Sequence, residues 1–156
     1  MWKGELVAVF IGSSFGEKMV EKSEVKAVPG KGLEGDRFFQ RVELDPKQHD
    51  PSREVTLIEI EAINAIKREH NIDFGLGDSR RNIVTRGVPL NHLVDQEFKV
   101  GEVLMLGIRL CEPCSHLANL TYKEILPALI HRGGLRAQII SGGVLRVGDT
   151  IEGNIY

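Results

Sequence analysis

The segment around Cys114 carries the most suggestive chemistry in this sequence. It reads RLCEPCSH (residues 109–116) and directly follows an apolar run, residues 103–108, that is typical of a strand. A thiol at a point where proline breaks a strand is held by the sheet and stays open to a ligand, whereas a cysteine in the core does not. Cys114 is therefore the candidate reactive residue, with its thiolate as nucleophile or metal ligand.

Three groups of residues could supply the positive charge that favours a thiolate or binds an anion: Asp36-Arg37, Arg80-Arg81-Asn82 and Arg109. The planar guanidinium group of arginine matches two phosphate oxygens at once and keeps its proton. Asn82 adds an amide that could donate to a ligand or to a loop backbone, and a glycine-rich turn could offer N–H groups to an anion. Structural interpretations stay open: Arg37 could pair with Asp36, and residues 80–81 could form a solvated turn.

The two cysteines, Cys111 and Cys114, have the spacing Cys-x-x-Cys, which invites two further interpretations. Structural zinc needs four ligands, so His116 and His131 would have to complete the set in an unfamiliar spacing, and we expect no zinc. A thioredoxin-type dithiol expects its first cysteine at a helix N-terminus, but Cys111 continues the strand pattern. We therefore interpret Cys111 as a small buried hydrophobic residue.

The periodicity of apolar residues predicts many short strands and few helices. Strands are expected at residues 5–11, 18–28, 83–85, 97–100, 103–110, 137–140 and 143–147, with the fourth and fifth joined by a hairpin-like turn at residues 101–102. Helical spacing starts at Val55 and predicts a helix over residues 58–70; another is expected within residues 121–130, and residues 41–52 are expected to form a long exposed loop. This pattern favours a mainly β fold, a closed or nearly closed antiparallel β-barrel with a few short helices.

Composition limits the class of protein. The chain of 156 residues is 42% hydrophobic and 27% charged, which fits one soluble domain spanning residues 1–156. It has no apolar run near the roughly 20 residues of a membrane span and no secretory signal pattern, so we expect a cytoplasmic protein with no membrane partner. Its formal net charge of -2 gives no general attraction to nucleic acid, and any anion site must be local.

Six stretches along the chain resemble the MOSC domain, the C-terminal module of molybdenum cofactor sulfurases, which also occurs as small free-standing proteins. They are GLEGDRF (32–38), REVTLI (53–58), RNIVTRG (81–87), FKVGE (98–102), Pro113-Cys114 and GGVLRVGD (142–149). Their order and spacing cover nearly the whole chain. The resemblance implies a β-barrel, in agreement with the predicted strands, and chemistry on the pterin-based molybdenum cofactor or on sulfur.

The resemblance also implies roles for individual residues. Cys114 matches the family's characteristic cysteine, a molybdenum ligand in some relatives and a persulfide carrier in others, while Cys111 is an additional residue. Arg37, Arg81 and Asn82 match positions that hold the phosphate and ring of the pterin. Soft thiolate suits a redox metal and guanidinium suits phosphate, so these roles agree with the residue chemistry.

Three functions follow as hypotheses. The first is a free-standing MOSC protein that binds molybdenum cofactor or carries sulfur for its maturation, with a desulfurase as sulfur-donor protein, because 156 residues leave no room for a pyridoxal-phosphate desulfurase domain. The second is a molybdenum-dependent reductase of N-hydroxylated compounds of the hydroxylaminopurine type, which takes electrons from an electron-transfer protein. The third is a non-catalytic anion- or cofactor-binding module whose thiol is structural.

Overall fold

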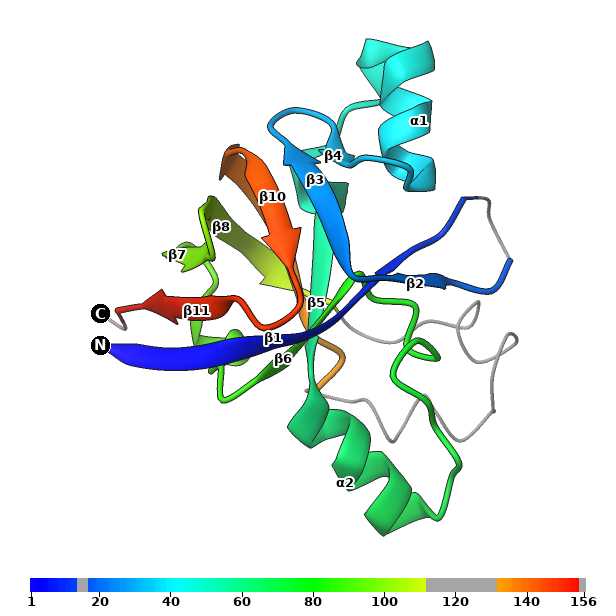
Figure 1. Cartoon of the computed structure of the whole chain (residues 1–156), viewed down its shortest axis with the longest axis vertical. Coiled ribbons are helices and arrows are strands. Elements are labelled where there is room, and N and C mark those ends of the chain that lie inside the picture. The colour runs from blue at the N-terminus through cyan, green and yellow to red at the C-terminus, as the bar shows by residue number, and fades with distance from the viewer. Residues whose placement is uncertain (14–16, 112–131, 155–156) are drawn as a thin grey trace.

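The computed structural model describes residues 1–13, 17–111 and 132–154, and its centre is a β-barrel (Figure 1). The main sheet contains β1 (Trp2–Ile11), β2 (Val20–Lys22), β5 (Val55–Glu59), β6 (Ile83–Arg86), β7 (Glu97–Val100), β8 (Val103–Leu110), β9 (Leu135–Ser141) and β11 (Thr150–Gly153). Their order is β11-β7-β8-β9-β5-β6-β1-β2, and β11 also pairs with β1. This pairing closes seven strands into a barrel, which confirms the predicted fold class.

The barrel is mixed, so the expectation of a wholly antiparallel barrel is wrong at one pair. β5 and β6 run parallel, with Leu57 opposite Ile83, whereas the other described pairs of the main sheet are antiparallel. A parallel pair needs a crossover, and α2 (Ile60–His70) supplies it. The helical pattern therefore starts later than expected, because the barrel takes residues 55–59 as a strand between β6 and β9.

A small second sheet, ordered β10-β3-β4, packs beside the barrel: β3 (Glu24–Val28), β4 (Gly32–Leu33) and β10 (Gly143–Arg146). The strand expected over residues 18–28 is thus two strands, because the chain changes sheets between β2 and β3. β2 pairs with β1, whereas β3 pairs with β10 and β4. The strands predicted near both chain ends, the 97–110 hairpin and β6 agree with the sequence pattern.

Residues 41–52 are mostly exposed, as the sequence suggested, but they do not form an irregular loop. They contain the end of α1 (Arg37–Leu44) and the short 3-10 turns η1 (Pro46–Gln48) and η2 (Pro51–Arg53). Phe38 and Val42 lie one helical turn apart and are buried, which anchors α1. Asp45 and Asp50 each accept a backbone N–H two residues ahead and so start a 3-10 turn, with proline at its first position. A last such turn is η3 (Leu90–His92).

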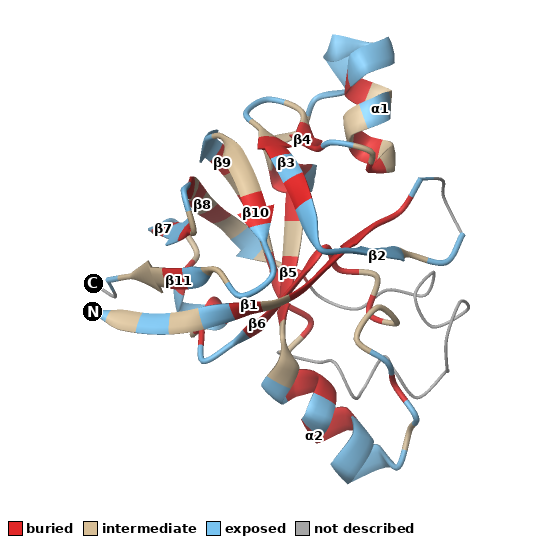
Figure 2. Ribbon diagram, viewed as in Figure 1, coloured by how far each residue is buried: buried red, intermediate tan, exposed pale blue. Residues whose placement is uncertain are grey.

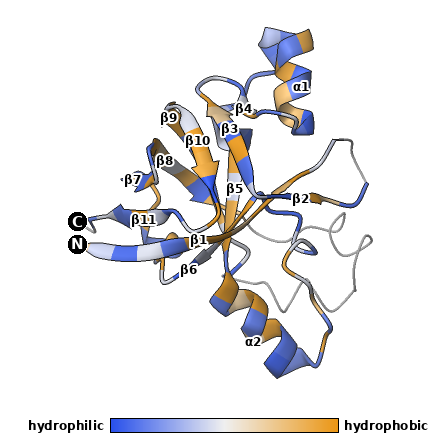
Figure 3. Cartoon of the chain, viewed as in Figure 1, coloured by the Kyte–Doolittle hydropathy of each residue, from blue (hydrophilic) through white to orange (hydrophobic). Residues whose placement is uncertain are grey.

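Two layers of hydrophobic residues share the strands of the barrel (Figures 2 and 3). On β1, Leu6, Val9 and Ile11 belong to the barrel interior, whereas Ala8 and Phe10 belong to the layer under α2. Leu6 and Ala8 are two residues apart and yet face opposite sides of the strand, so the alternation changes phase between them. The β1–β6 pairing is irregular at the same place. The outer face of β1, β5 and β6 is therefore partly covered by a helix.

Two sequence expectations concern the region after β8. Cys111 is buried, with 2% of its surface exposed, which confirms its interpretation as a small core residue. The helix expected within residues 121–130 lies outside the described residues. None of the described helices is long and apolar enough to cross a membrane.

Candidate functional site

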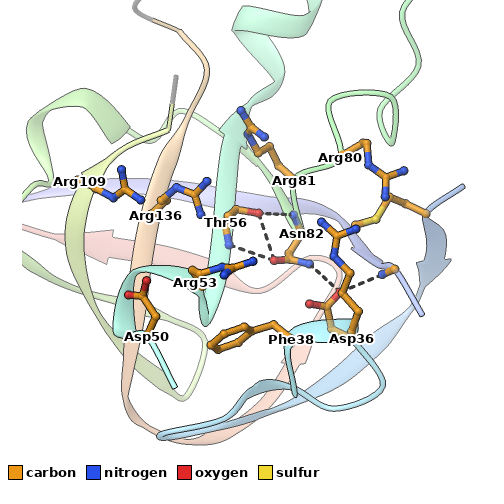
Figure 4. Close-up of a pocket in the computed structure, with 13 residues that line it drawn as sticks. Asp36, Phe38, Asp50, Arg53, Thr56, Arg80, Arg81, Asn82, Arg109 and Arg136 are labelled. Carbon is orange, nitrogen blue, oxygen red and sulfur yellow. Dashed lines mark hydrogen bonds between the residues drawn. The ribbon is translucent and has the colours of Figure 1, made fainter. Parts of the chain in front are cut away.

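An open pocket of about 410 Å³ lies against the barrel, at the end of β5 and β6 away from α2 (Figure 4). Its charged lining consists of Asp36, Arg37, Asp50, Arg53, Arg80, Arg81, Arg109 and Arg136. Among the described residues, six of the eleven arginines of the chain thus line one cavity, against two aspartates and no lysine. The volume is within the range of roughly 300–1,000 Å³ that is usual for small-molecule sites.

The register of four neighbouring strands places a row of polar residues along this pocket. Arg109 of β8 lies opposite Arg136 of β9, and Arg136 lies opposite Thr56 of β5. The parallel pairing of β5 with β6 continues the row to Asn82, just before β6. Residues directly opposite one another share a face of the sheet, so these side chains point to the same outer side.

α2 does not cover this part of the outer face. Ile58 and Val84, each two residues beyond the polar row, lie in the hydrophobic layer under α2. The alternate residues Leu57 and Ile83 point into the barrel. Strand alternation therefore gives one face of β5 and β6 a helix-covered half and a polar half, and the pocket occupies the polar half.

Asn82 is fixed in place by a network of hydrogen bonds (Figure 4). Its Oδ1 accepts from the backbone N and from Oγ1 of Thr56, both at 3.1 Å. Its Nδ2 donates to the carbonyl of Phe10 at 3.1 Å and to Oδ1 of Asp36 at 3.5 Å. Of the two uses that the sequence allowed for this amide, binding a ligand or a backbone, the structure shows the second, so Asn82 joins β1, β5 and α1 at the base of the pocket.

Asp36 ties the start of α1 to the end of β1. Its buried Oδ1 accepts from the backbone N of Gly12 at 2.9 Å, and the backbone N of Arg37 donates to the carbonyl of Gly12 at 2.7 Å. Burial raises the pKa of Asp36 from its ordinary value, although the bond from Gly12 and the charge of Arg37 act in the opposite direction. The double link to Gly12 positions Arg37 at the pocket.

Arg37 and Arg80 are close enough to affect each other electrostatically. Burial lowers the pKa of Arg37, and the charge of Arg80 lowers it further. Arg80 adopts a left-handed backbone conformation, with φ of 62°, and its guanidinium donates to the carbonyl of Glu17. These two arginines and the buried Asp36 form one end of the pocket.

Arg81 is 9% exposed, which excludes a solvated turn for this residue. Its Nε donates to the carbonyl of Gly133 at 2.9 Å, and in Figure 4 its guanidinium points away from Asp36. Gly134, the residue after Gly133, accepts a hydrogen bond at its carbonyl from the backbone N of Cys111, at 2.7 Å. The described residues on either side of 112–131 are therefore held near the pocket, and Gly133 is held by a residue that lines it.

The other end of the pocket is built from η2, β8, β9 and Phe38 (Figure 4). The guanidinium of Arg53 lies over the ring of Phe38, 5.6 Å from its centre. Asp50 accepts from the N and Oγ of Ser52, at 3.0 and 2.8 Å, and these bonds are the largest influence lowering its pKa. Arg109 and Arg136 complete this end.

Buried Glu54 fixes η2 to β9. Its Oε1 accepts from the backbone N of Ile139 at 3.0 Å, and its Oε2 lies 2.6 Å from Nε2 of His49. Because Glu54 directly follows Arg53, this contact determines where Arg53 enters the pocket.

The structure thus brings together the predicted residues Arg37, Arg81 and Asn82 around one cavity. Cys114 lies outside the described residues, three positions after Cys111 in the sequence. Sequence reasoning missed Asp50, Arg53 and Arg136 as site residues. Arg136 had one available signal, a charge between the apolar Leu135 and Ala137, but this pattern indicates only a side chain that points out of the barrel.

The chemistry of the lining fits a phosphate-bearing anion such as the pterin cofactor implied by the family resemblance. Arginine is suited to bidentate phosphate binding, and Arg37, Arg80 and Arg81 supply it beside Asn82. In the described part of the chain, no three His, Cys, Asp or Glu side chains lie close enough together to hold a metal ion. A thiolate ligand for molybdenum would come from Cys114.

Comparisons with known proteins identify the fold and the family. The structure is similar to the crystal structure of the YuaD protein from Bacillus subtilis, with a TM-score of 0.79 and 15% identity over 97% of each chain. It is also similar to YiiM from Geobacillus stearothermophilus (TM-score 0.69, 14% identity, 95% of this chain and 73% of that one). For YiiM from Escherichia coli, the TM-score is 0.70 and the identity 20%, over 96% of this chain and 68% of that one. No curated protein matches the sequence. The model of the MOSC domain matches residues 45–152, so the chain belongs to the MOSC domain family.

Proposed function

We propose that this protein binds molybdenum cofactor, or accepts and delivers sulfur for its maturation, with Cys114 as the molybdenum ligand or persulfide carrier. The observation that carries the proposal is the arginine-lined pocket beside Cys111 and Gly133, the described residues that flank the segment containing Cys114. Three residues of extended chain span at most about 11 Å, so Cys114 is covalently tethered close to Cys111.

In this proposal Arg37 and Arg81 bind the phosphate of the cofactor, and Asn82 holds the pocket wall against which the pterin lies. The cofactor supplies a redox-active molybdenum when bound. The residues of the chain orient it: Asp36 and Asn82 fix the positions of Gly12 and Phe10, and the Gly12 carbonyl in turn positions Arg37. The arginines also favour the thiolate form of a cysteine close to them.

Sulfur transfer would proceed by thiol–persulfide exchange. The Cys114 thiolate attacks the outer sulfur of a persulfide on a desulfurase, the sulfur–sulfur bond of the donor breaks, and the donor cysteine leaves as a thiolate. Cys114 then carries the transferred sulfur as its own persulfide, with no net oxidation. The desulfurase is the partner of this step.

Native mass spectrometry tests the proposal on protein purified from a molybdenum-replete host that contains a desulfurase. We expect the wild-type protein to carry the mass of the cofactor or of one added sulfur atom. Cys114→Ser should lose the sulfur or the molybdenum, whereas the matched variant Cys111→Ser should keep both. Equal amounts of cofactor or sulfur on Cys114→Ser and wild type would contradict the proposal, as would unmodified wild-type protein.

A second candidate function is reduction of N-hydroxylated compounds. The observation that favours it is the second polar end of the pocket, around Arg53, where a substrate would bind next to the cofactor. An N–OH group would accept two electrons and two protons to give N–H and water, with the electrons from a flavin or iron–sulfur partner protein. Growth in the presence of hydroxylaminopurine, compared between cells with and without the protein, tests this function. Resistance that requires Cys114 supports it, and slow reaction of Cys114 with thiol reagents supports a non-catalytic binding module instead.

A further inference from the structure

Arg53, Arg109 and Arg136 come from three separate elements and meet at one end of the pocket (Figure 4). β8 and β9 place Arg109 and Arg136 directly opposite one another, and η2 brings Arg53 toward them. The charge of Arg136 acts on Arg53, and the charge of Arg109 acts on Asp50, so the four groups are close in space.

These three guanidinium groups have no acidic partner in a salt bridge within the described residues, nor a side-chain hydrogen bond there. Four of the five arginines outside the pocket do form salt bridges: Arg68 and Arg132 with Glu69, Arg86 with Glu5, and Arg146 with Glu24 and Glu102. The fifth, Arg41, forms none with the described residues. The donors of Arg53, Arg109 and Arg136 are therefore available to a ligand.

Folding brings these like charges together at an energetic cost. Like charges directly opposite on neighbouring strands destabilise a sheet, and Arg109 and Arg136 occupy such positions. Of the residues that the structure describes, Asp50 is the one acidic side chain that lines this end, and its Oδ1 already accepts two bonds from Ser52. A bound anion with two negative charges would supply the missing compensation.

We propose that Arg53, Arg109 and Arg136 form a second phosphate-binding subsite, distinct from the Arg37 end of the same pocket. Planar donors that approach from three elements suit the three terminal oxygens of a phosphate group, and the Phe38 ring supports Arg53 from below. The ligand of this subsite is a phosphate monoester, or the second phosphate of a ligand that spans the pocket. The assignment of the Arg37 end to the cofactor phosphate rests on the proposed function; the existence of two subsites does not.

Isothermal titration calorimetry with inorganic phosphate and pyrophosphate tests the subsite on the purified protein. We expect two phosphate ions per chain. The double variant Arg109→Gln/Arg136→Gln should keep one site and weaken the other at least roughly tenfold, since each lost guanidinium removes a charge-assisted hydrogen bond. Arg37→Gln should weaken only the site at the Arg37 end of the pocket. Arg86→Gln, which changes a surface salt bridge outside the pocket, should match wild type.

Two results would overturn the subsite: one phosphate per wild-type chain, or unchanged binding by the double variant with an unchanged unfolding temperature. Protein loaded with cofactor distinguishes the two sources of the phosphate. A nucleoside monophosphate that binds loaded wild type, but not the loaded double variant, identifies a phosphorylated substrate. If the mass of the cofactor on the loaded protein is that of a dinucleotide form, the phosphate at this subsite is the second phosphate of the cofactor. Failure of the proposed function would appear separately, as missing cofactor and sulfur with phosphate binding intact.

Discussion

Asp36 combines a structural role with an electrostatic cost. Its carboxylate holds Gly12 and contacts Asn82, yet it is buried at 8% exposure beside the pocket. Burial raises its pKa in the folded protein above the ordinary carboxyl value. The hydrogen bond from Gly12, the charge of Arg37 and the bond from Asn82 oppose this shift by favouring the charged form.

This raised pKa gives stability a defined pH dependence. Between the ordinary and the raised pKa, the folded state binds more protons than the unfolded state, so the contribution of Asp36 to stability falls as pH rises. Asp36→Asn keeps an Oδ1 acceptor for Gly12 and removes this titration. We expect the free energy of unfolding of Asp36→Asn, minus that of wild type, to increase from about pH 4 to pH 7.

Urea unfolding of both proteins across this pH range measures the difference. Asp36→Ala serves as the comparison, because it leaves the buried N–H of Gly12 without its acceptor and should cost about 1–3 kcal/mol. A difference curve for Asp36→Asn that is flat or falls with pH would show that burial does not dominate at this carboxyl.

At the scale of elements, the hydroxyl of Thr56 joins β5 to β6. Oγ1 donates to Oδ1 of Asn82 and accepts from the backbone N of Asn82, at 3.1 and 3.0 Å. Thr56→Val removes both bonds at nearly constant volume, and we expect a loss of about 1–3 kcal/mol in the free energy of unfolding. Thr150→Val, at an exposed position on β11, should change stability by less than about 0.5 kcal/mol.

The same variant also probes the site. Because Thr56 holds the amide that forms the base of the pocket, phosphate binding at the Arg37 end should weaken in Thr56→Val, and titration calorimetry measures this. Unchanged stability together with unchanged phosphate affinity would mean that Asn82 keeps its position without the hydroxyl.

Gly134 allows β9 to begin against β5. Its φ is +107°, and a Cβ there would lie 1.9 Å from the carbonyl oxygen of Leu57. Gly134→Ala therefore adds a steric clash to backbone strain. We expect this variant to lose well above about 2 kcal/mol in the free energy of unfolding. Gly30→Ala is the matched control, since Gly30 also has positive φ, +79°, but faces open space. Equal losses in chemical denaturation would mean that conformation alone, without the clash, sets the cost.

Sequence periodicity predicted elements where one local pattern decided the structure. The hairpin of β7 and β8 and the strands β1 and β6 follow from alternation and turn residues. α1 was missed because only Phe38 and Val42 are buried on it and prolines follow closely. β5 was read as the start of a helix because its strand conformation depends on pairing with β6 and β9, which are distant in the sequence.

The site residues likewise divide into those that a local sequence pattern indicates and those that depend on contacts between distant parts of the chain. Arg37, Arg81 and Asn82 were candidates because each lies next to a strand end or a glycine-rich turn, and the resemblance to the MOSC domain selected them. The convergence of Arg109 with Arg136 could not, because it depends on the register between two strands, and no local pattern specifies that register. Arg53 reaches the pocket through the contact of Glu54 with β9, which is equally nonlocal.

At the scale of the whole molecule, charge is unevenly distributed. The formal net charge is -2, yet the described lining of the pocket contains six arginines and two aspartates, so the rest of the chain is more strongly acidic than the total suggests. A basic cavity in an acidic surface attracts anions locally and repels them elsewhere. Anionic ligands should consequently be guided to the pocket at low ionic strength.

Ionic strength therefore controls binding in a predictable direction. The screening length shortens from about 30 Å at 0.01 M salt to about 8 Å at 0.15 M, so the affinity and association rate of pyrophosphate should each fall several-fold over this range. Arg109→Gln/Arg136→Gln should show a shallower dependence than wild type, because fewer pocket charges remain, whereas Arg86→Gln should keep the wild-type dependence. Stopped-flow and calorimetric measurements at matched osmolarity test this. A double variant with the full wild-type salt dependence would mean that charges outside the pocket, rather than its arginines, attract the ligand.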